Sequence, residues 1–286
     1  MDVVTDDPTG ATEVASVARP AVIEIDDVDD PRVAAYVGVR DRDVSGHHDG
    51  FIAEGDVVVR VLIERGRYAI RSLLISGRRR DRLDDVVAGL DPSVPIYVAA
   101  QPVMDAIVGF SMHRGLLALG ARGPGLDADT LLASLPPSAT VVGVIGLANH
   151  DNMGGIFRNA AAFGAAAVLL DQASCDPLYR KAIRVSAGHA LAVPFARCPS
   201  AGAMLDALAA HGFEAIALSP SGAERIDTLA AGPRRAILVG AEGPGLPADI
   251  LARTRAVRIH LAAGVDSLNV SVACAIALHA LTPVTR

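Results

Sequence analysis

The sequence predicts an α/β protein made of two units, the second of which is built around a parallel sheet. Apolar runs of strand length alternate along the chain with segments of helical period. A stretch rich in proline, glycine and serine, residues 121–140, interrupts this alternation. With 286 residues, of which 51% are hydrophobic, the chain can bury a sizeable core in one large domain or two ordinary ones.

The first α/β unit is predicted at residues 20–122. Residues 1–19, which precede it, have acids and turn formers but no apolar period, so we expect a disordered acidic tail there. Strands are expected at 51–55, 68–76, 94–100 and 115–120, and helices at 56–66, 78–90 and 101–109. Residues 123–139 are expected to form a linker around a short helix.

The second unit, residues 140–286, repeats the alternation more regularly. Strands are expected at 140–147, 165–170, 214–219, 235–240 and 256–261, and helices at 153–164, 177–190, 201–212, 247–254 and after 269. Strands that are apolar throughout indicate a parallel sheet covered on both faces. Ligands of such sheets bind beyond the carboxyl ends of the strands, where three loops hold most of the unusual polar residues: 148–158, 240–245 and 260–269.

Composition argues against several classes of protein. No apolar run approaches the roughly 18 residues of a membrane span, and the acidic N-terminus does not resemble a secretory signal, so we expect a cytoplasmic protein with no membrane partner. The three cysteines are far apart and lack C-x-x-C spacing. We therefore expect reduced, mostly buried thiols, with neither a disulfide framework nor a metal site.

The net charge of −6 conceals a basic segment. Nine acids and one base lie in residues 1–31, which leaves a charge of +2 on the remainder. Residues 60–82 contain eight arginines against two acids. This segment is a candidate phosphate-binding surface, and a solvated helix face is the alternative.

The loop at 240–245 raises one alternative function. Residues 243–248, Gly-Pro-Gly-Leu-Pro-Ala, satisfy the loose G-x-G-x-x-A dinucleotide pattern. A nicotinamide site also needs an acid at the end of the next strand, and the first carboxylate there is Asp266, inside the following loop. The sequence therefore disfavours a dehydrogenase. The glycines still indicate close approach of a ligand to the backbone, with Glu242 held in the turn.

The other two loops each have a structural and a functional interpretation. Gly154 and Gly155 weaken the start of a helix, which suggests that another part of the molecule packs against the backbone there. Arg158 follows one turn later and suits a phosphate or a polarised oxygen, whereas the structural alternative makes Asn152 an N-cap and Arg158 a surface residue. Likewise, Ser267 and Asn269 either cap the last helix or face a ligand.

Three ordered motifs are shared with a known family. The first, N-x-G-x-x-x-R, runs here from Asn152 to Arg158. The second, a strand followed by G-x-E-G-x-G-L, runs from Gly240 to Leu246. The third begins with the apolar Ile259 and leads to S-L-N-V-S-V-A at 267–273. In these motifs the chain resembles the SpoU (TrmH-type) branch of the SPOUT RNA 2'-O-ribose methyltransferases.

The resemblance implies a fold, a cofactor and an assembly. The C-terminal segment would be threaded into a deep trefoil knot, an exception to the usual unknotted topology, and residues 20–122 would form a ribosomal-protein-like substrate-binding domain. S-adenosylmethionine would bind in the knotted loops, and two copies would pair through the knotted domain. Carried over by position, the residues that contact the cofactor are Gly240, Gly245, Ile259, Leu261 and Leu268.

The implied reaction is methyl transfer to a ribose 2'-hydroxyl of RNA. Arg158 is expected to hold the neighbouring phosphate and stabilise the developing alkoxide, because a guanidinium is a poor base. Catalytic geometry would be fixed by Asn152, Glu242, Ser267 and Asn269. The candidate RNA contacts outside the reaction site are Arg78, Arg79, Arg80 and Arg82.

Ribosomal RNA is the expected substrate, and transfer RNA is the second candidate. An RNA-binding assembly factor that keeps the knot without methylating is the alternative from another class. One residue departs from the family's pattern, because His260 stands where a proline is usual. A catalytic base at this position is a further alternative, which competes with a merely local hydrogen bond.

Overall fold

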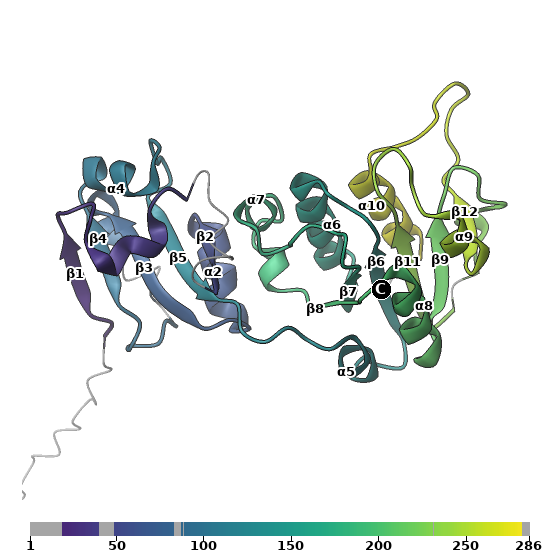
Figure 1. Ribbon diagram of the computed structural model, residues 1–286, viewed down its shortest axis with the longest axis horizontal. Helices are drawn as coiled ribbons and strands as arrows, with labels where there is room; N and C mark the ends of the chain where they lie inside the picture. The colour runs from purple at the N-terminus through teal and green to yellow at the C-terminus, as the bar shows by residue number, and fades with distance from the viewer. Residues whose placement is uncertain (1–18, 40–48, 83–86, 88, 231, 282–286) are drawn as a thin grey trace, which may run out of the picture.

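The computed structural model describes residues 19–39, 49–82, 87, 89–230 and 232–281. Two sheets lie side by side, and the predicted tail at 1–19 lies outside the described residues except for Arg19 (Figure 1). Within the described ranges no helix is both long and apolar enough to cross a bilayer.

The first sheet has five strands in the order β1-β4-β3-β5-β2. Its strands are β1 (Val22–Ile25), β2 (Gly50–Glu54), β3 (Ile70–Ser76), β4 (Ile96–Ala99) and β5 (Leu116–Ala121). β1, β4 and β3 are parallel, whereas β5 runs antiparallel to both β3 and β2. Side chains alternate between the faces, so Leu73 and Ile75 pack with α2 (Asp56–Arg65), while Leu74 packs with α4 (Gln101–Val108) and the 3-10 helix η1 (Pro31–Tyr36).

The second sheet has seven strands, all parallel, which confirms the predicted parallel sheet. Its order is β10-β12-β9-β11-β6-β7-β8. The strands are β6 (Ala139–Val144), β7 (Ala167–Leu170), β8 (Phe195–Arg197), β9 (Glu214–Leu218), β10 (Glu224–Arg225), β11 (Arg234–Val239) and β12 (Arg255–Arg258). From β6 the chain runs outward through β7 to β8, crosses to β9 and the edge strand β10, and then fills the two positions left between with β11 and β12.

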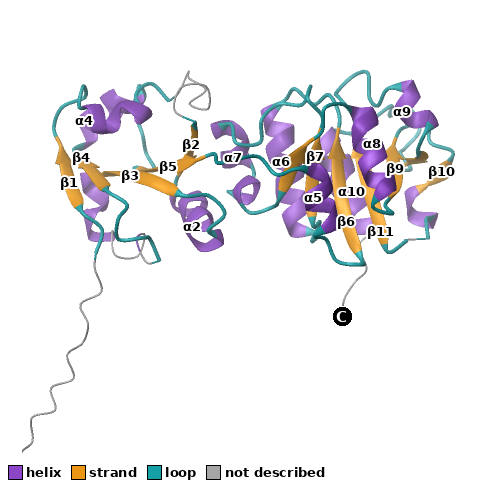
Figure 2. Cartoon of the chain, turned by 60° about the horizontal axis from the view of Figure 1, so that its bottom comes forward, coloured by secondary structure: helices purple, strands orange, loops and turns teal. Residues whose placement is uncertain are grey.

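Helices cover both faces of this sheet, as fully apolar strands require (Figure 2). One face packs against α6 (His150–Ala162), α7 (Arg180–Val185) and α10 (Val270–Leu281). The other packs against α5 (Ala128–Ala133), α8 (Ala201–Ala210) and α9 (Ala248–Ala252). Gly143 of β6 lets α8 approach, because a Cβ there would lie 2.9 Å from the sulfur of Met204.

The two units share a core cluster. Leu178, Ile183 and Leu191, from α7 and its flanks, pack with apolar side chains of β2, β3 and α2. At the same contact the buried carboxylate of Glu54 accepts from Arg180 over 2.7 Å. Removing one partner of such a buried pair costs about 3–5 kcal/mol. We infer that the first unit is held against α7 rather than tethered only by residues 122–127.

Most expected elements are present, and the exceptions are short or broken. The predicted helix at 177–190 is wrong as one element, because positive φ values at Ala187 and Gly188 (53° and 86°) separate α7 from the 3-10 helix η3 (His189–Leu191). In place of the start of the helix predicted at 78–90 lies the 3-10 helix η2 (Gly77–Arg82), and residues 83–86 and 88 lie outside the described residues. β1, β10, η1 and the 3-10 helix η4 (Ile226–Thr228) were not predicted from the sequence. The knot stays a prediction.

Candidate active site

A cavity of about 610 Å³ opens at the carboxyl ends of β9, β11 and β12. Eight of the ten predicted catalytic and cofactor residues line it: Gly240, Glu242, Gly245, Ile259, Leu261, Ser267, Leu268 and Asn269. Ligand cavities in proteins are commonly on the order of 300–1,000 Å³. The second and third predicted loops therefore form one ligand-sized site.

The floor of the cavity is a tight backbone turn after β11. The N–H of Gly245 donates to the carbonyl of Ala241 over 3.0 Å, and Gly243 and Gly245 have φ values of 87° and 70°, which favour glycine. Gly240 faces this turn so closely that a Cβ would lie 2.4 Å from the carbonyl carbon of Gly245. Any side chain at position 240 would displace the floor.

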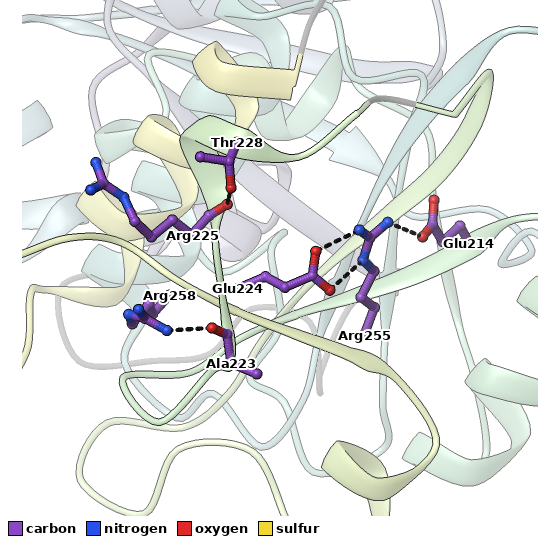
Figure 3. A network of polar contacts seen from close by, with 7 residues as sticks. All are labelled: Glu214, Ala223, Glu224, Arg225, Thr228, Arg255 and Arg258. Carbon is purple, nitrogen blue, oxygen red and sulfur yellow. Dashed lines mark hydrogen bonds and ion pairs between the residues drawn. The ribbon is translucent and has the colours of Figure 1, made fainter.

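One wall of the cavity is the loop after β9, which contributes Ser219, Pro220 and Ser221. Arg258 of β12 donates to the carbonyl of Ala223 over 2.5 Å (Figure 3). It also donates to the carbonyl of Gly222 over 2.6 Å. Gly222 lies directly on β12, where a Cβ would be 2.4 Å from the carbonyl carbon of Val257.

A second arginine of β12 holds β10, the strand that follows the loop, to β9. Arg255 bridges Glu214 of β9, at 3.0 Å, and Glu224 of β10, at 2.9 Å and 2.6 Å (Figure 3). The two arginines therefore hold this wall against the edge of the sheet. This loop was not predicted as part of a site, although the turn formers in "SPSG" at 219–222 could have indicated it.

A chain of hydrogen bonds joins all three predicted loops. Asn152 is 6% exposed, and its Nδ2 donates to Oε1 of Glu242. Nδ2 of Asn269 donates to Oδ1 of Asn152 over 2.8 Å. One buried amide thus connects α6 to two residues that line the cavity.

The capping alternatives for Asn152 and Ser267 are wrong. Asn149 caps α6, because its Oδ1 accepts from the backbone N–H groups of Asp151 and Asn152 over 2.8 Å and 3.3 Å. At the start of α10, Oδ1 of Asn269 accepts from the N–H of Ser271 over 3.0 Å. Asn152 and Ser267 are therefore not used as caps, and Asn269 caps its helix while it contacts Asn152.

Arg158 is not among the residues that line the cavity. It follows Asn152 by six residues, which is about 240° around an α-helix, and its side chain is exposed. The pKa of His189 is lowered first by burial and then by the charges of Arg158 and Arg65. Arg158 thus lies on the side of α6 that faces η3 and α2, and the structure does not bring it to the cavity of its own chain.

The predicted RNA-contacting arginines lie in η2 of the first unit. Arg79 forms an ion pair with Asp56, in which Nη2 donates to Oδ2 over 2.8 Å, and Arg80 pairs with Glu24. Arg78 is exposed and has no ion pair with any described residue. Arg82 ends η2, and its side chain lies outside the described residues.

His260 is exposed and does not line the cavity, so the geometry lends no support to a catalytic base at this position. The described residues include no group of three or more His, Cys, Asp and Glu side chains that could hold a metal ion.

The cavity suits a nucleoside that carries charged groups. Leu246, Ile259 and Leu268 supply apolar surface for a base, while Ser219, Ser221 and Ser267 supply hydroxyls for a sugar and an amino-acid tail. The turn at 240–245 adds backbone groups. This mixture of mostly apolar walls with a few polar groups is typical of cofactor sites, and it fits S-adenosylmethionine.

Comparisons with known proteins agree with this arrangement. Residues 139–279 match the model of the SpoU rRNA Methylase family. An uncharacterised tRNA/rRNA methyltransferase of Mycobacterium tuberculosis is 37% identical over 284 residues, covering 95% of this chain and 96% of the relative.

Solved structures share the fold over nearly the whole chain. An RNA 2'-O ribose methyltransferase is 25% identical, with a TM-score of 0.74 over 91% of this chain and 98% of that one. An rRNA methyltransferase from Sinorhizobium meliloti has a TM-score of 0.78 at 22% identity, over 91% and 97% of the two chains. The chain therefore belongs to the SpoU rRNA methylase family, whose members are RNA methyltransferases that take the methyl group from S-adenosylmethionine.

Proposed function

We propose that this protein methylates a ribose 2'-hydroxyl in ribosomal RNA. The observation that carries the proposal is the hydrogen-bonded chain Glu242–Asn152–Asn269 at the edge of the cavity. It places a carboxylate and an amide, both held by a third side chain, beside the space that suits the cofactor. A relative described as an RNA 2'-O ribose methyltransferase supports the choice of the ribose oxygen.

The cofactor would lie in the cavity between the glycine-rich turn at 240–245 and the apolar side chains that follow β12. Gly240, Ile259 and Leu268 would hold its adenosine part, with Leu261 and Gly245 beside them. When bound, S-adenosylmethionine supplies an electrophilic methyl group on a sulfonium. The protein's part is to present the hydroxyl in line with that methyl and to help remove its proton.

Two polar side chains at the rim would position the ribose. Oε1 of Glu242 is held by Asn152, and Oε2 has no hydrogen bond among the described residues, so Oε2 can accept from the 2'-hydroxyl. Ser267 lines the same edge of the cavity and can bind the neighbouring sugar oxygen. Because Asn152 holds both Glu242 and Asn269, the site is preorganised before RNA binds.

We propose further that Arg158 acts across a homodimer. Its side chain is directed away from the cavity of its own chain, as the helical phase of α6 requires. Val272 and Ile276, one turn apart on α10, are 46% and 38% exposed and form a short apolar stripe on that helix. Such a stripe is typical of a subunit contact. In the dimer, Arg158 of one copy would stabilise the alkoxide that develops in the cavity of the other.

The RNA species can be tested in cells. A 2'-O-methyl group blocks cleavage at the adjacent phosphate in alkali, so total RNA from strains with and without the gene is hydrolysed and sequenced. We expect one protected position in ribosomal RNA that disappears with the gene. A protected position in transfer RNA would instead support the second candidate substrate. No difference in either RNA would favour the non-catalytic assembly factor.

A further inference from the structure

A second cavity lies in the first unit, at the carboxyl ends of the parallel strands β3 and β4. Its volume is about 400 Å³, and its lining includes Ser76, Arg78, Gln101, Asp105, His113 and Gly115. Neither the methyl-transfer site nor the family motifs include any of these residues. Its size suits a single small group rather than a duplex.

The acidic side of this cavity is rigidly built. Ser76, which is 1% exposed, donates from Oγ to Oε1 of Gln101 over 2.8 Å. Nε2 of Gln101 donates to Oδ1 of Asp105 over 2.7 Å and to the carbonyl of Met112 over 3.0 Å. The backbone N–H of Met112 also donates to Oδ1 of Asp105, over 2.9 Å. Two donors therefore fix one carboxylate oxygen.

The other carboxylate oxygen, Oδ2 of Asp105, has no hydrogen bond with any residue that the structure describes. Because Oδ1 is held from two directions, the carboxylate cannot turn without breaking both bonds. Asp105 consequently offers one fixed acceptor to a donor group of a ligand.

The opposite side of the cavity is basic. Arg79 is turned toward Asp56 by its ion pair, and its Cδ would lie 3.2 Å from a Cβ at position 115, so Gly115 is needed for this packing. Arg78 lies next to it with no ion pair among the described residues, and His113 adds a ring at the rim. A ligand that fits these groups is anionic at one end and carries an N–H donor and a planar ring at the other.

We propose that this cavity binds one unpaired nucleotide of the RNA substrate, with Arg78 on its phosphate and Oδ2 of Asp105 on an exocyclic amine of its base. Proteins that read single-stranded RNA bind splayed-out bases through their edges and stack them on rings such as histidine. Adenine, cytosine and guanine carry an exocyclic amine, and uracil does not. The inference rests on the proposed function only in taking RNA as the substrate.

The decisive variant is Asp105→Asn. The N–H groups of Gln101 and Met112 would hold the amide oxygen in the place of Oδ1, so Nδ2 would take the place of Oδ2. The substitution thus reverses the hydrogen-bonding character of the cavity with little change in shape. Loss of a negative charge strengthens binding of every RNA, so the readout is the ratio of affinities rather than one affinity.

Binding is measured by fluorescence anisotropy with labelled eight-nucleotide oligo(A), oligo(C) and oligo(U), without S-adenosylmethionine. We expect the wild-type protein to bind oligo(A) or oligo(C) about tenfold or more tightly than oligo(U), and Asp105→Asn to lose or reverse that preference. Equal ratios in the two proteins would overturn the proposal. Because no methyl transfer is measured, failure of the proposed reaction would leave this result interpretable.

Two further measurements identify the phosphate contact and the source of the nucleotide. Arg78→Ala should weaken binding of all three oligonucleotides and lower the slope against salt by about one, whereas the control Arg71→Ala, at the opposite end of β3, should not. An unchanged slope for Arg78→Ala would contradict the phosphate contact.

Free AMP should compete only weakly with the labelled oligonucleotide, since the oligonucleotide adds further contacts. Equally tight binding of AMP would point to a mononucleotide ligand and overturn the RNA assignment.

Discussion

Asn269 donates from Nδ2 to Oδ1 of Asn152 over 2.8 Å, although 117 residues separate them in sequence. Asn152 in turn donates to Glu242, so a single buried amide connects three loops that follow different strands. Each loop alone has an ordinary structural explanation. Their connection through one side chain is what makes them a site.

Loss of this amide should impair the reaction more than cofactor binding. In Asn152→Ala, Glu242 and Asn269 lose their shared partner, and we expect the rate of methyl transfer to fall at least about tenfold. Asn152 does not line the cavity, so the Kd for S-adenosylmethionine should change little. Radiolabelled transfer assays and calorimetry measure the two quantities.

The matched control for this variant is Asn159→Ala on the same helix. Asn159 donates to the carbonyl of Ser271 over 2.7 Å and has no bond to Glu242. The substitution Asn159→Ala should lower the free energy of unfolding by about 0.5–1.5 kcal/mol without slowing the reaction. Equal rates for Asn152→Ala and the wild type would exclude a catalytic role for the chain of hydrogen bonds.

The floor of the cavity should not tolerate a methyl group. In Gly240→Ala the new Cβ meets the backbone of Gly245 at 2.4 Å, so the turn must move and S-adenosylmethionine should bind at least about tenfold more weakly. Gly202→Ala is the control, because its Cβ has no contact closer than 3.6 Å and alanine favours the helix. Unchanged cofactor affinity in Gly240→Ala would show that the turn is not part of the cofactor site.

The wall formed by residues 219–223 should depend on Arg258. Arg258→Ala removes both hydrogen bonds to the loop, and we expect the Kd for S-adenosylmethionine to rise several-fold because binding must then order the loop. Arg253→Ala is the comparison, since it breaks only the exposed pair with Asp206. If both variants bound the cofactor like the wild type, the loop would not need this support.

Arg158 should be supplied by the second subunit. Arg158→Ala and Asn152→Ala are each expected to be nearly inactive alone, but a co-expressed heterodimer would hold one complete site. A random mixture should then recover about a quarter of wild-type activity, because half of the dimers are mixed and one of their two sites is intact. No recovery, with heterodimers confirmed by differential tags, would place Arg158 in the site of its own chain.

The cysteines should be unreactive while the protein is folded. Burial raises the pKa of Cys175 and Cys198 to about 11 and that of Cys274 to about 12. A raised pKa lowers the thiolate fraction at pH 8, and the thiolate is the nucleophile. Ellman's reagent at pH 8 should therefore react slowly with the native protein. After denaturation it should react rapidly with all three thiols. Rapid reaction of one thiol in the native state would contradict its burial.

The sequence predicts the parts of this protein that depend on hydrophobic period and local turn chemistry. Apolar strands such as 140–147 and glycine-rich turns such as 240–245 carry their own signals, so the parallel sheet and the cavity floor could be placed. β10 could not, because a strand of two residues at a sheet edge has no period and exists through its pairing with β12.

Residue-level geometry was harder to predict for a physical reason. Asn149 and Asn152 are both good N-caps, and only the helix start that tertiary contacts select decides between them. The direction of Arg158 depends on the phase of α6, which is set by packing of Gly154 against the carbonyl of Ala182 and the side chain of Val185. A glycine pair in the sequence indicates close packing without indicating which element packs.

The chemical identity of the product tests the proposed function most directly. Purified protein is incubated with ribosomal RNA from a strain lacking the gene and with S-adenosylmethionine labelled in the methyl group, and the RNA is digested to nucleosides for mass spectrometry. We predict that the label appears on the ribose of a single nucleoside as a 2'-O-methyl group, and that Asn152→Ala yields little of it. Label on a base, or an RNA that stays unlabelled while the cofactor binds, would contradict ribose methylation.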